Sequence, residues 1–366
     1  MQVRLFRTTD GAPVEGNNVV PVSEVSWKLG YNEADDIELK MPASRELLRF
    51  GARQKMRPWR TLAAVVDDGG YVIAAGPILR RKWTPDELTV KVGGGWSLFE
   101  KRLVLNRALR TGWVDGELLV DEDNPAGPFV LQFAGMTLGG IGAGLVREAL
   151  QWGPLAVDSP VSEAGTQVRT YYGWDFATVS ERLEDLSKVI GGPFIRFEPY
   201  LRSDGFLRFR YVADQGGEVV HTVATGMEQA GGVIDDIDED GDNMATQAYM
   251  VGGKEDDVAL VARSSSPVLV DEGWPVMQVA DTSHSTVSQM STLVGYGEQI
   301  VADGSSNPES TRLKLRRSRQ VRPGDVLEVF TDNSYHGRIN ALQLDVAAVS
   351  GDLTEWVSVT AFPRGF

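Results

Sequence analysis

The chain has 366 residues, 42% of them hydrophobic, and its 51 acidic and 36 basic residues give a formal net charge of −15. This length exceeds the size at which a single hydrophobic core usually stops growing, so we expect two or three domains, and the apolar content excludes a disordered chain. The negative charge argues against tight binding of DNA phosphates over the whole surface, because such binding depends on many cations.

Several kinds of site are excluded by what the sequence lacks. It has no cysteine, which excludes disulfides, thiol catalysis and thiolate metal sites. Its three histidines, His221, His284 and His336, have no metal-ligand spacing, so we expect no metal and no cofactor. No apolar run approaches the roughly 18 residues that cross a bilayer, and the first residues lack the apolar stretch of a secretory signal. We therefore expect no membrane-spanning segment, and we expect the chain to be made and folded in the cytoplasm.

The first hundred residues predict β-structure. The segments EVSWKLG (24–30) and DIELKMP (36–42) are typical of two short strands joined by a turn. Pro42 is placed to open a short helical turn and Gly51 to end it. Two β-rich runs then flank DDGG (67–70), which is a strong hairpin signal, and ELTVKVGGGWSLFEKRLVL adds a strand and a bend. Together these segments predict a small antiparallel barrel or sandwich.

From about residue 106 the pattern becomes mixed. TLGGIGAGLVREALQWG has helical spacing, and WDFATVSERLEDLSKVIGG predicts a second helix that Asp175 caps and Gly191 ends. FIRFEPYLRSDGFLRFRYV predicts two strands around the turn Ser203-Asp204-Gly205. The expected apolar stripe of the second helix consists of Phe176, Val179, Leu183, Leu186 and Ile190.

The segment VIDDIDEDGDNM (233–244) concentrates six carboxylates in eight residues. From Asp236 it matches the first half of an EF-hand loop, but the ninth and twelfth positions are Met244 and Gln247, so the bidentate glutamate of a calcium loop is missing. We expect a solvated acidic loop or a charged surface facing a partner instead. The basic stretch KLRRSRQVR (314–322) is expected to be the solvated face of a strand or a salt-bridged subunit contact.

The rest of the chain predicts more strands and one helix. Residues 249–251 and 258–261 have strand-type sequences, and a helix is expected from Thr286, where Gln289 has capping-box spacing. The last seventy residues predict strands again, with a turn at Pro323-Gly324-Asp325.

Neither of two apparent catalytic or cofactor patterns is supported. GGIGAGLV resembles a dinucleotide fingerprint, but Leu145 stands where the third glycine belongs, so a glycine-rich start of a packed helix is favoured. Scattered serines, histidines and aspartates lack the context of a catalytic triad, and nothing in the spacing of the 51 acids singles out a glycosidase pair. The sequence by itself therefore identifies no catalytic residues, and a pair of carboxylates for glycoside hydrolysis stays open.

The order of these segments resembles the bacteriophage tail hub family, which includes baseplate hubs and tail-associated minor tail proteins. The resemblance covers nearly the whole chain, with Phe99 and Arg102 at the approximate family spacing. It is carried by VSWKLGYNEADDIELKMP, LLRFGARQKMRPW, LAAVVDDGGYVIAAGPILRRKW, TVKVGGGWSLFEKRL, MTLGGIGAGLVREAL, WDFATVSERLEDLSKVIGGPFIRFEPYL, NMATQAYMVGG and VRPGDVLEVF.

The resemblance implies an α+β, predominantly β fold, in which two tail-tube-like antiparallel β-barrel domains bracket a mixed α/β insert. The expected domains are residues 1–105, 106–235 and 236–366, although a strand of one barrel could come from residues beyond 200. Three chains would form a ring that joins the six-fold tube to the three-fold tail tip of the virion and lets DNA pass without specific binding. Expected partners are the distal tail or tail tube protein, the tape-measure protein, and tail fibre or receptor-binding proteins.

The acidic segment then gains an expected role, because carboxylates that line a channel repel DNA phosphates. We expect Asp235, Asp236, Asp238, Glu239, Asp240 and Asp242 to face the lumen or its mouth, and exposure for solubility alone is the competing hypothesis. No lytic domain is expected after the last predicted strand, so the resemblance implies a structural, non-enzymatic protein. The alternative function is a carbohydrate-binding or cell-wall glycan hydrolase component, which a hydrolysis assay would reveal. Nine tryptophans favour it mildly, but Trp27, Trp83 and Trp96 are expected to pack in the core.

Overall fold

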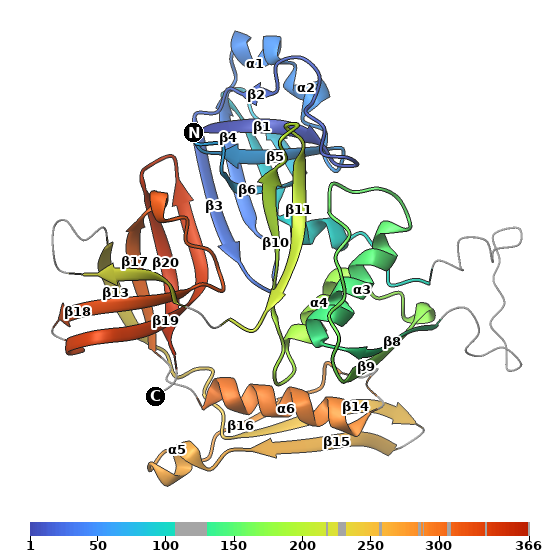
Figure 1. The fold of residues 1–366 in the computed structure, drawn as a ribbon, viewed down its shortest axis with the longest axis vertical. Helices are drawn as coiled ribbons and strands as arrows, with labels where there is room; N and C mark the ends of the chain where they lie inside the picture. Colours follow the sequence, from blue (N-terminus) through green and yellow to red (C-terminus); the bar gives the residue numbers. More distant parts are fainter. Residues whose placement is uncertain are drawn as a thin grey trace, which may run out of the picture.

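The computed structural model of the chain describes residues 1–106, 130–216, 219–225, 232–255, 258–284, 287, 289–305, 309–333 and 335–364. Strands make up 48% and helices 19% of the structure, and the sheets are mainly antiparallel, so the predominantly β prediction is confirmed. Figure 1 shows a blue strand group at the N-terminus, a green helical group beside it, a red strand group near the C-terminus, and a sheet with one long helix below them.

The N-terminal strand group contains the strands that the sequence predicts. The hairpin at residues 67–70 is confirmed: the Asp67 N–H donates to the Tyr71 carbonyl at 2.9 Å, and Gly70 takes the left-handed conformation that the tight turn requires. The elements are β1 (Gln2–Arg7), β2 (Val19–Val20), β3 (Glu24–Gly30), β4 (Asp36–Pro42), α1 (Arg45–Phe50), α2 (Ala52–Lys55), β5 (Thr61–Val66), β6 (Val72–Trp83), β7 (Glu87–Gly93) and the 3-10 helix η1 (Gly95–Phe99).

The short helix α1 ends as predicted but begins at Arg45, three residues later than Pro42 would place it. Gly51 ends it in the left-handed conformation, and its N–H donates to the Leu48 carbonyl. Pro42, however, is the last residue of β4, and the N-cap is Ser44, whose hydroxyl accepts the Leu47 N–H at 3.2 Å. A serine side chain can satisfy a free backbone donor at a helix start, whereas proline cannot.

The mixed middle part follows the predicted order of helices and strands. Both predicted helices are present, and the two strands around Ser203-Asp204-Gly205 pair antiparallel over their full lengths. The elements are β8 (Val130–Met136), α3 (Leu138–Leu150), β9 (Gln167–Tyr172), η3 (Gly173–Asp175), α4 (Val179–Ser187), β10 (Phe194–Leu201) and β11 (Leu207–Asp214).

The start and the apolar face of α4 differ from the prediction. Its N-cap is Thr178 rather than Asp175, and Thr178 forms a capping box with Glu181 in which each side chain accepts the other residue's backbone N–H. The helix therefore begins after Phe176, which is 58% exposed, and ends before Ile190, which is 48% exposed. Only the central members of the predicted stripe, Val179, Leu183 and Leu186, are buried.

The glycines of α3 are explained by close packing rather than by a cofactor. A Cβ on Gly142 would lie 2.2 Å from the Tyr211 hydroxyl, and one on Gly144 would lie 2.5 Å from the Phe133 ring. Glycine lets strand side chains approach the helix backbone here, as a tightly packed helix requires. The expectation of a glycine-rich, packed helix is therefore confirmed.

The C-terminal half contains a second strand group and a separate three-stranded sheet. The helix expected from Thr286 is α6, which begins at Met290; Thr286 itself lies outside the described residues. The separate sheet consists of β14 (Gln247–Glu255), β15 (Val258–Ser265) and β16 (Gln278–Asp281), with α5 (Val268–Asp271) and α6 (Met290–Gly304). The strand group consists of β12 (Val219–Ala224), β13 (Gly232–Glu239), β17 (Glu309–Arg316), η4 (Arg317–Arg319), β18 (Val326–Asn333), β19 (Gly337–Asp352) and β20 (Trp356–Pro363).

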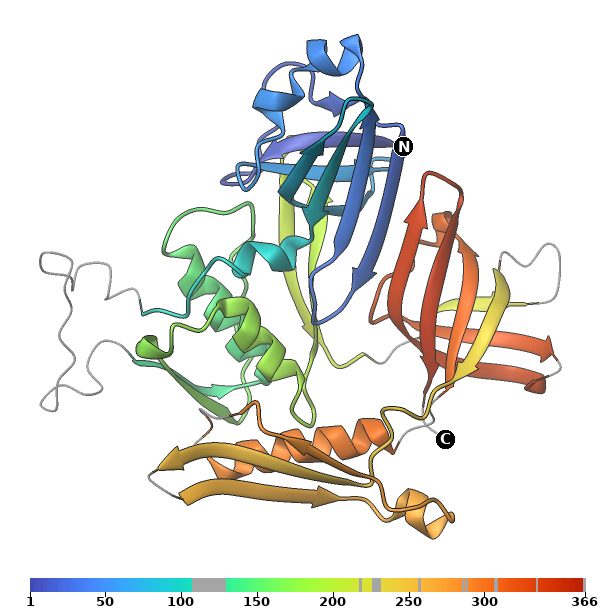
Figure 2. The ribbon, with the colours of Figure 1, turned by 180° about the vertical axis from the view of Figure 1, so that it is seen from behind.

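The two strand groups join into one 13-stranded sheet, because β19 pairs antiparallel with β3. Its main path runs β13-β17-β20-β19-β3-β4-β7-β6-β5-β1-β2, and β12 pairs with β18 beside β19. This order is an open path, and the described strands contain no closed barrel. The prediction of two barrel domains is therefore not confirmed. Two mainly antiparallel strand groups are observed, side by side in the large sheet, with the helices of the mixed part beside the N-terminal group (Figures 1 and 2).

Strand β5 separates two hydrophobic cores. Leu62, Ala64 and Val66 point into a core shared with the middle part, while Ala63 and Val65 point into a core shared with the C-terminal strand group. All six residues of β5 are buried, because side chains alternate between the two faces of a strand and both faces are covered. A leucine or valine side chain stabilises the fold by roughly 1.5–3 kcal/mol when fully buried, and an alanine by less.

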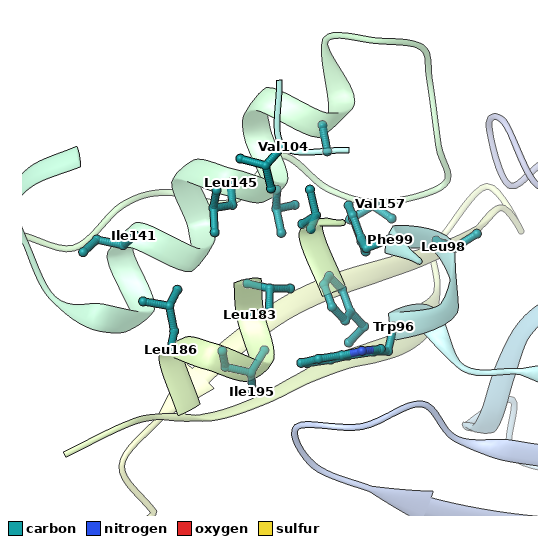
Figure 3. Close-up of a cluster of buried hydrophobic side chains, with 14 of the residues drawn as sticks. Trp96, Leu98, Phe99, Val104, Ile141, Leu145, Val157, Leu183, Leu186 and Ile195 are labelled. Carbon is teal, nitrogen blue, oxygen red and sulfur yellow. The ribbon is translucent and has the colours of Figure 1, made fainter. Parts of the chain in front are cut away.

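The first core is drawn in Figure 3, where side chains from η1, α3 and α4 meet strand β10. The Phe99 and Phe197 rings stack there with centroids 4.8 Å apart. Trp96 belongs to this core and Trp27 to the second one, as predicted for both. Trp83 is 49% exposed at the end of β6, so the prediction of core packing is wrong for this residue.

A pair of glycine substitutions tests the packing of α3. Alanine normally stabilises a helix relative to glycine by roughly 0.5–1 kcal/mol. We expect Gly140→Ala to lower the free energy of unfolding by about 1–3 kcal/mol instead, because its Cβ would lie 2.5 Å from the Glu163 carbonyl oxygen in the backbone. The control is Gly295→Ala in α6, where the nearest atoms are 3.9 Å away. Urea denaturation measures both, and equal effects would contradict the close approach at Gly140.

Candidate functional site

The acidic segment lies at one end of the large sheet. Asp235, Asp236, Asp238 and Glu239 belong to β13, the first strand of the path, and Asp240 and Asp242 follow it. All six residues are exposed, as predicted, but the first four are in a strand rather than a loop. A register shift opposite β17, between Ile234 and Asp236, interrupts the alternation from which a strand is recognised.

The cations that pair with this segment come from the neighbouring strand. Lys314 contacts the Asp235 carboxylate at 2.7 Å, and Arg312 contacts Asp236 at 2.5 Å. These contacts cross the β13–β17 ladder, so the acidic segment and the start of the predicted basic stretch are partners within one chain. The four side chains are between 36% and 52% exposed, so each pair contributes little to stability, about 0–1 kcal/mol.

The other four acids of the segment have no cation partner among the described residues. The Tyr335 hydroxyl donates to Glu239 at 2.6 Å, and this hydrogen bond raises the pKa of the Tyr335 phenol. Asp240 accepts the backbone N–H of Asp242 at 2.9 Å, which closes a local turn. Among the described residues, no cation pairs with Asp238, Asp240 or Asp242. Negative charge is therefore left uncompensated at the end of β13 and in the turn.

The partial EF-hand match does not correspond to EF-hand geometry. Asp236 and Asp238 lie on a strand that is hydrogen-bonded to β17, whereas an EF-hand loop wraps its ligands around the ion and is flanked by helices. Within the described ranges, no cluster of three or more acidic, histidine or cysteine side chains is arranged to hold a metal ion. The acidic segment is therefore an exposed, charged sheet edge.

A half-buried ion network joins the three parts of the chain, and the sequence did not predict it. Arg322 contacts Glu198 at 2.9 Å and donates to the Tyr71 hydroxyl at 2.7 Å, while Arg196 contacts Glu198 at 3.0 Å and Asp214 at 2.7 Å. Burial opposes the ionisation of Glu198, but the two guanidinium groups outweigh it and lower the pKa of this carboxyl. Arg322 thus links the C-terminal strand group to β10 and to the hairpin of β5 and β6.

A half-buried carboxyl lies close to this junction. Asp35 accepts the Gly30 N–H at 3.3 Å, and its side chain covers Gly94, where an added Cβ would lie 2.2 Å from it. Burial raises the pKa of Asp35 to about 7, the hydrogen bond from Gly30 opposes this, and the nearby Glu33 adds to it. Asp35 is therefore largely protonated in the folded protein at mildly acidic pH.

The three histidines contact carboxylates rather than each other. His221, His284 and His336 pair with Asp325, Asp281 and Glu309 at 3.7, 3.2 and 2.9 Å. The described part of the chain has no helix of the length and apolarity that crossing a membrane demands.

The fold described above is that of phage tail proteins, which confirms the resemblance predicted from the sequence. No protein-family model matches the sequence, and no curated protein is similar to it. The likeness is therefore one of structure.

Two solved structures illustrate it over nearly the whole chain. A tail protein from Neisseria meningitidis MC58 superposes with a TM-score of 0.55 at 14% identity, covering 100% of this chain and 97% of that one. The 43 kDa tail protein of prophage MuSo2 from Shewanella oneidensis gives a TM-score of 0.54 at 10% identity, covering 99% and 98%. At such identities the comparison establishes the fold.

The raised pKa of Asp35 predicts a pH-dependent stability. Between about pH 4 and pH 7 the unfolded chain loses the proton from this carboxyl while the folded chain keeps it, so stability falls as the pH rises through this range. We expect Asp35→Asn to remove this loss and to raise the free energy of unfolding by about 1–3 kcal/mol at pH 8, with little effect at pH 4. Thermal unfolding at both pH values measures this, with the exposed Asp271→Asn as the control. An equal effect at the two pH values would be inconsistent with a raised pKa.

Proposed function

We propose that the chain is a structural, non-enzymatic hub protein at the tip of a bacteriophage tail. The observation that carries this proposal is the likeness of the whole fold to two tail proteins, over both strand groups and the parts between them. Three copies would form a ring that joins the six-fold tube to the three-fold tip. The two strand groups supply the repeated element that such a junction needs, because two similar units in each of three chains give six positions.

In this proposal the domains are residues 1–105, 106–235 and 236–366, and the first and last are tail-tube-like barrel domains. Strand β12 and the start of β13 come before residue 236 but would belong to the last domain, because β12 pairs with β18 and β13 pairs with β17 of the C-terminal strand group. Residues 247–304 would be a smaller insert within the last domain, since β14, β15, β16 and α6 make a separate layer. Each barrel would be completed in the assembled ring.

The proposed partners belong to the tail. The ring would contact the distal tail or tail tube protein on one side and tail fibre or receptor-binding proteins on the other, with the tape-measure protein within. Phage DNA would pass through without specific binding. The protein would be assembled in the host cytoplasm and reside in the virion at the tail tip.

We also propose that the acidic segment faces the lumen or its mouth. The uncompensated carboxylates of Asp238, Asp240 and Asp242 support this role, because fixed negative charge repels phosphates and provides no cation for them to pair with. Asp235, Asp236 and Glu239 would contribute less to that field, since each has a hydrogen-bonding partner in the chain.

The ring predicts a particular symmetry. We expect an image of the intact tail tip to show three copies about a three-fold axis. If the ring also forms in isolation, the purified protein should have a mass near 120 kDa, three times that of the 40.0 kDa chain. A single copy at the tip, or copies related by a two-fold axis, would refute the ring.

The acidic lumen predicts a defect in DNA ejection. We expect phages with Asp238→Lys, Asp240→Lys and Asp242→Lys to assemble in normal numbers but to eject DNA at least about threefold more slowly, because a cationic lining attracts the phosphate backbone. The matched control replaces Asp271, Glu272 and Glu298, three other exposed acids, with lysine. Release of DNA after receptor addition measures the rate. Equal rates in both triple variants would favour exposure for solubility alone.

A further inference from the structure

A cationic groove opens between the N-terminal strand group and the helical middle part. It has a volume of about 690 Å³ and lies around η1, the teal helix between the blue and green parts of Figure 2. Backbone hydrogen bonds fix its walls: the Thr8 N–H donates to the Arg60 carbonyl at 3.1 Å, and the Ala156 N–H donates to the Thr8 carbonyl at 2.9 Å. The groove is lined by Arg7, Thr8, Thr9, Trp59, Arg60, Leu98, Lys101, Arg102, Pro154 and Leu155.

The charge of this lining is opposite to that of the molecule. The ten lining residues include four cations and no acid, in a chain whose net charge is −15. Of these cations, Arg7 pairs with Asp10 outside the groove, whereas Arg60 and Lys101 are exposed and have no ion pair with another described residue. Arg102 is half-buried and donates to the Gly153 carbonyl at 3.2 Å, so its charge is held in place without a carboxylate.

The groove also has an apolar wall that includes an unusually held aromatic residue. Trp59 has a φ of 61°, a left-handed conformation that bulky residues rarely adopt and that often marks a functional position. The backbone N–H of Trp59 donates to the Ile78 carbonyl at 2.8 Å, and this hydrogen bond fixes the strained backbone. The half-buried Trp59 therefore lines the groove together with Leu98, Pro154 and Leu155. Leu98 lies at the edge of the core shown in Figure 3.

We propose that this groove binds an acidic peptide segment that carries an apolar side chain, contributed by a neighbouring protein. Carboxylates of the peptide would pair with Arg60, Lys101 and Arg102, and its apolar side chain would pack on Trp59. The aliphatic side chains of Leu98, Pro154 and Leu155 suit an apolar side chain better than a nucleobase, which stacks on aromatic rings. The negative field of the chain opposes the many phosphates of DNA more than the few carboxylates of a short peptide segment. The proposal rests on the proposed tail function only for the expectation that the peptide belongs to another tail protein.

The test uses the whole chain and a defined probe. A fluorescein-labelled peptide of sequence Glu-Asp-Leu-Phe-Glu-Asp is titrated with the protein, and its fluorescence anisotropy is measured at 50 and 300 mM salt. We expect saturable binding that weakens several-fold at the higher salt concentration. The peptide Gln-Asn-Leu-Phe-Gln-Asn should bind at least tenfold more weakly, because it has the same shape and lacks the charges. Equal binding of the two peptides would overturn the proposal.

A matched pair of double variants locates the binding. Arg60→Ala with Lys101→Ala removes two exposed cations of the groove, and we expect it to weaken binding of the acidic peptide at least tenfold. Arg45→Ala with Arg49→Ala removes two exposed cations of α1 and should leave binding unchanged. Thermal unfolding of each variant is measured as a control, and we expect a folded protein in both cases. An equal loss of peptide affinity in the two double variants would contradict binding in the groove.

A short single-stranded DNA is the second probe, and it tests the alternative that the groove binds nucleic acid. If the DNA binds more tightly than the peptide, and the groove variant abolishes this binding, the groove recognises nucleic acid and the peptide proposal fails. These measurements use the isolated chain. Their failure would therefore leave the three-fold ring untouched, and a tail tip without three-fold symmetry would leave peptide binding standing.

Discussion

The pairing of β3 with β19 is the constraint on which the rest of the arrangement depends. It joins residues 26–30 to residues 348–352, which are more than 300 positions apart in the chain, and so makes one sheet from two strand groups. The C-terminal strand group contributes to the same core as β3, so neither group has a complete core of its own. The Arg322 network then ties the C-terminal strand group to β10 of the middle part and to the hairpin of β5 and β6.

Charge in this molecule is organised by strand pairing rather than by sequence blocks. The acidic segment and the basic stretch both stand out in the sequence, and each was expected to be either a solvated surface or a contact with another protein or subunit. The ladder between β13 and β17 instead brings Asp235 to Lys314 and Asp236 to Arg312. The charges that the proposals assign to external contacts are three acids of the same segment, which have no cation partner among the described residues, and a group of cations in the groove beside η1.

The sequence predicted local features well, because their causes lie within a few residues. The hairpin at residues 67–70, the glycine that ends α1 and the packed glycines of α3 each follow from backbone or packing rules. The Thr178–Glu181 capping box was also readable from its spacing, and choosing Asp175 instead misplaced the start of α4.

Features that depend on distant pairing could not be predicted in this way. The link between β3 and β19, the open path in place of closed barrels and the ion network around Glu198 unite residues from separate parts of the chain. Of the candidate site, the exposure of the six acids was predicted, but their strand and their partners were not. The groove was not predicted at all, because its ten residues come from four separate segments.

The two-sided burial of β5 has a consequence for biosynthesis. Leu62, Ala64 and Val66 belong to a core in which many residues come after residue 130, whereas the core on the opposite face combines residues 3–92 with residues beyond 220. A nascent chain of the first hundred residues therefore carries a strand whose first apolar face lacks most of its cover and whose second face is only partly covered. Protection by a chaperone, or rapid completion of translation, would keep such an intermediate from aggregating.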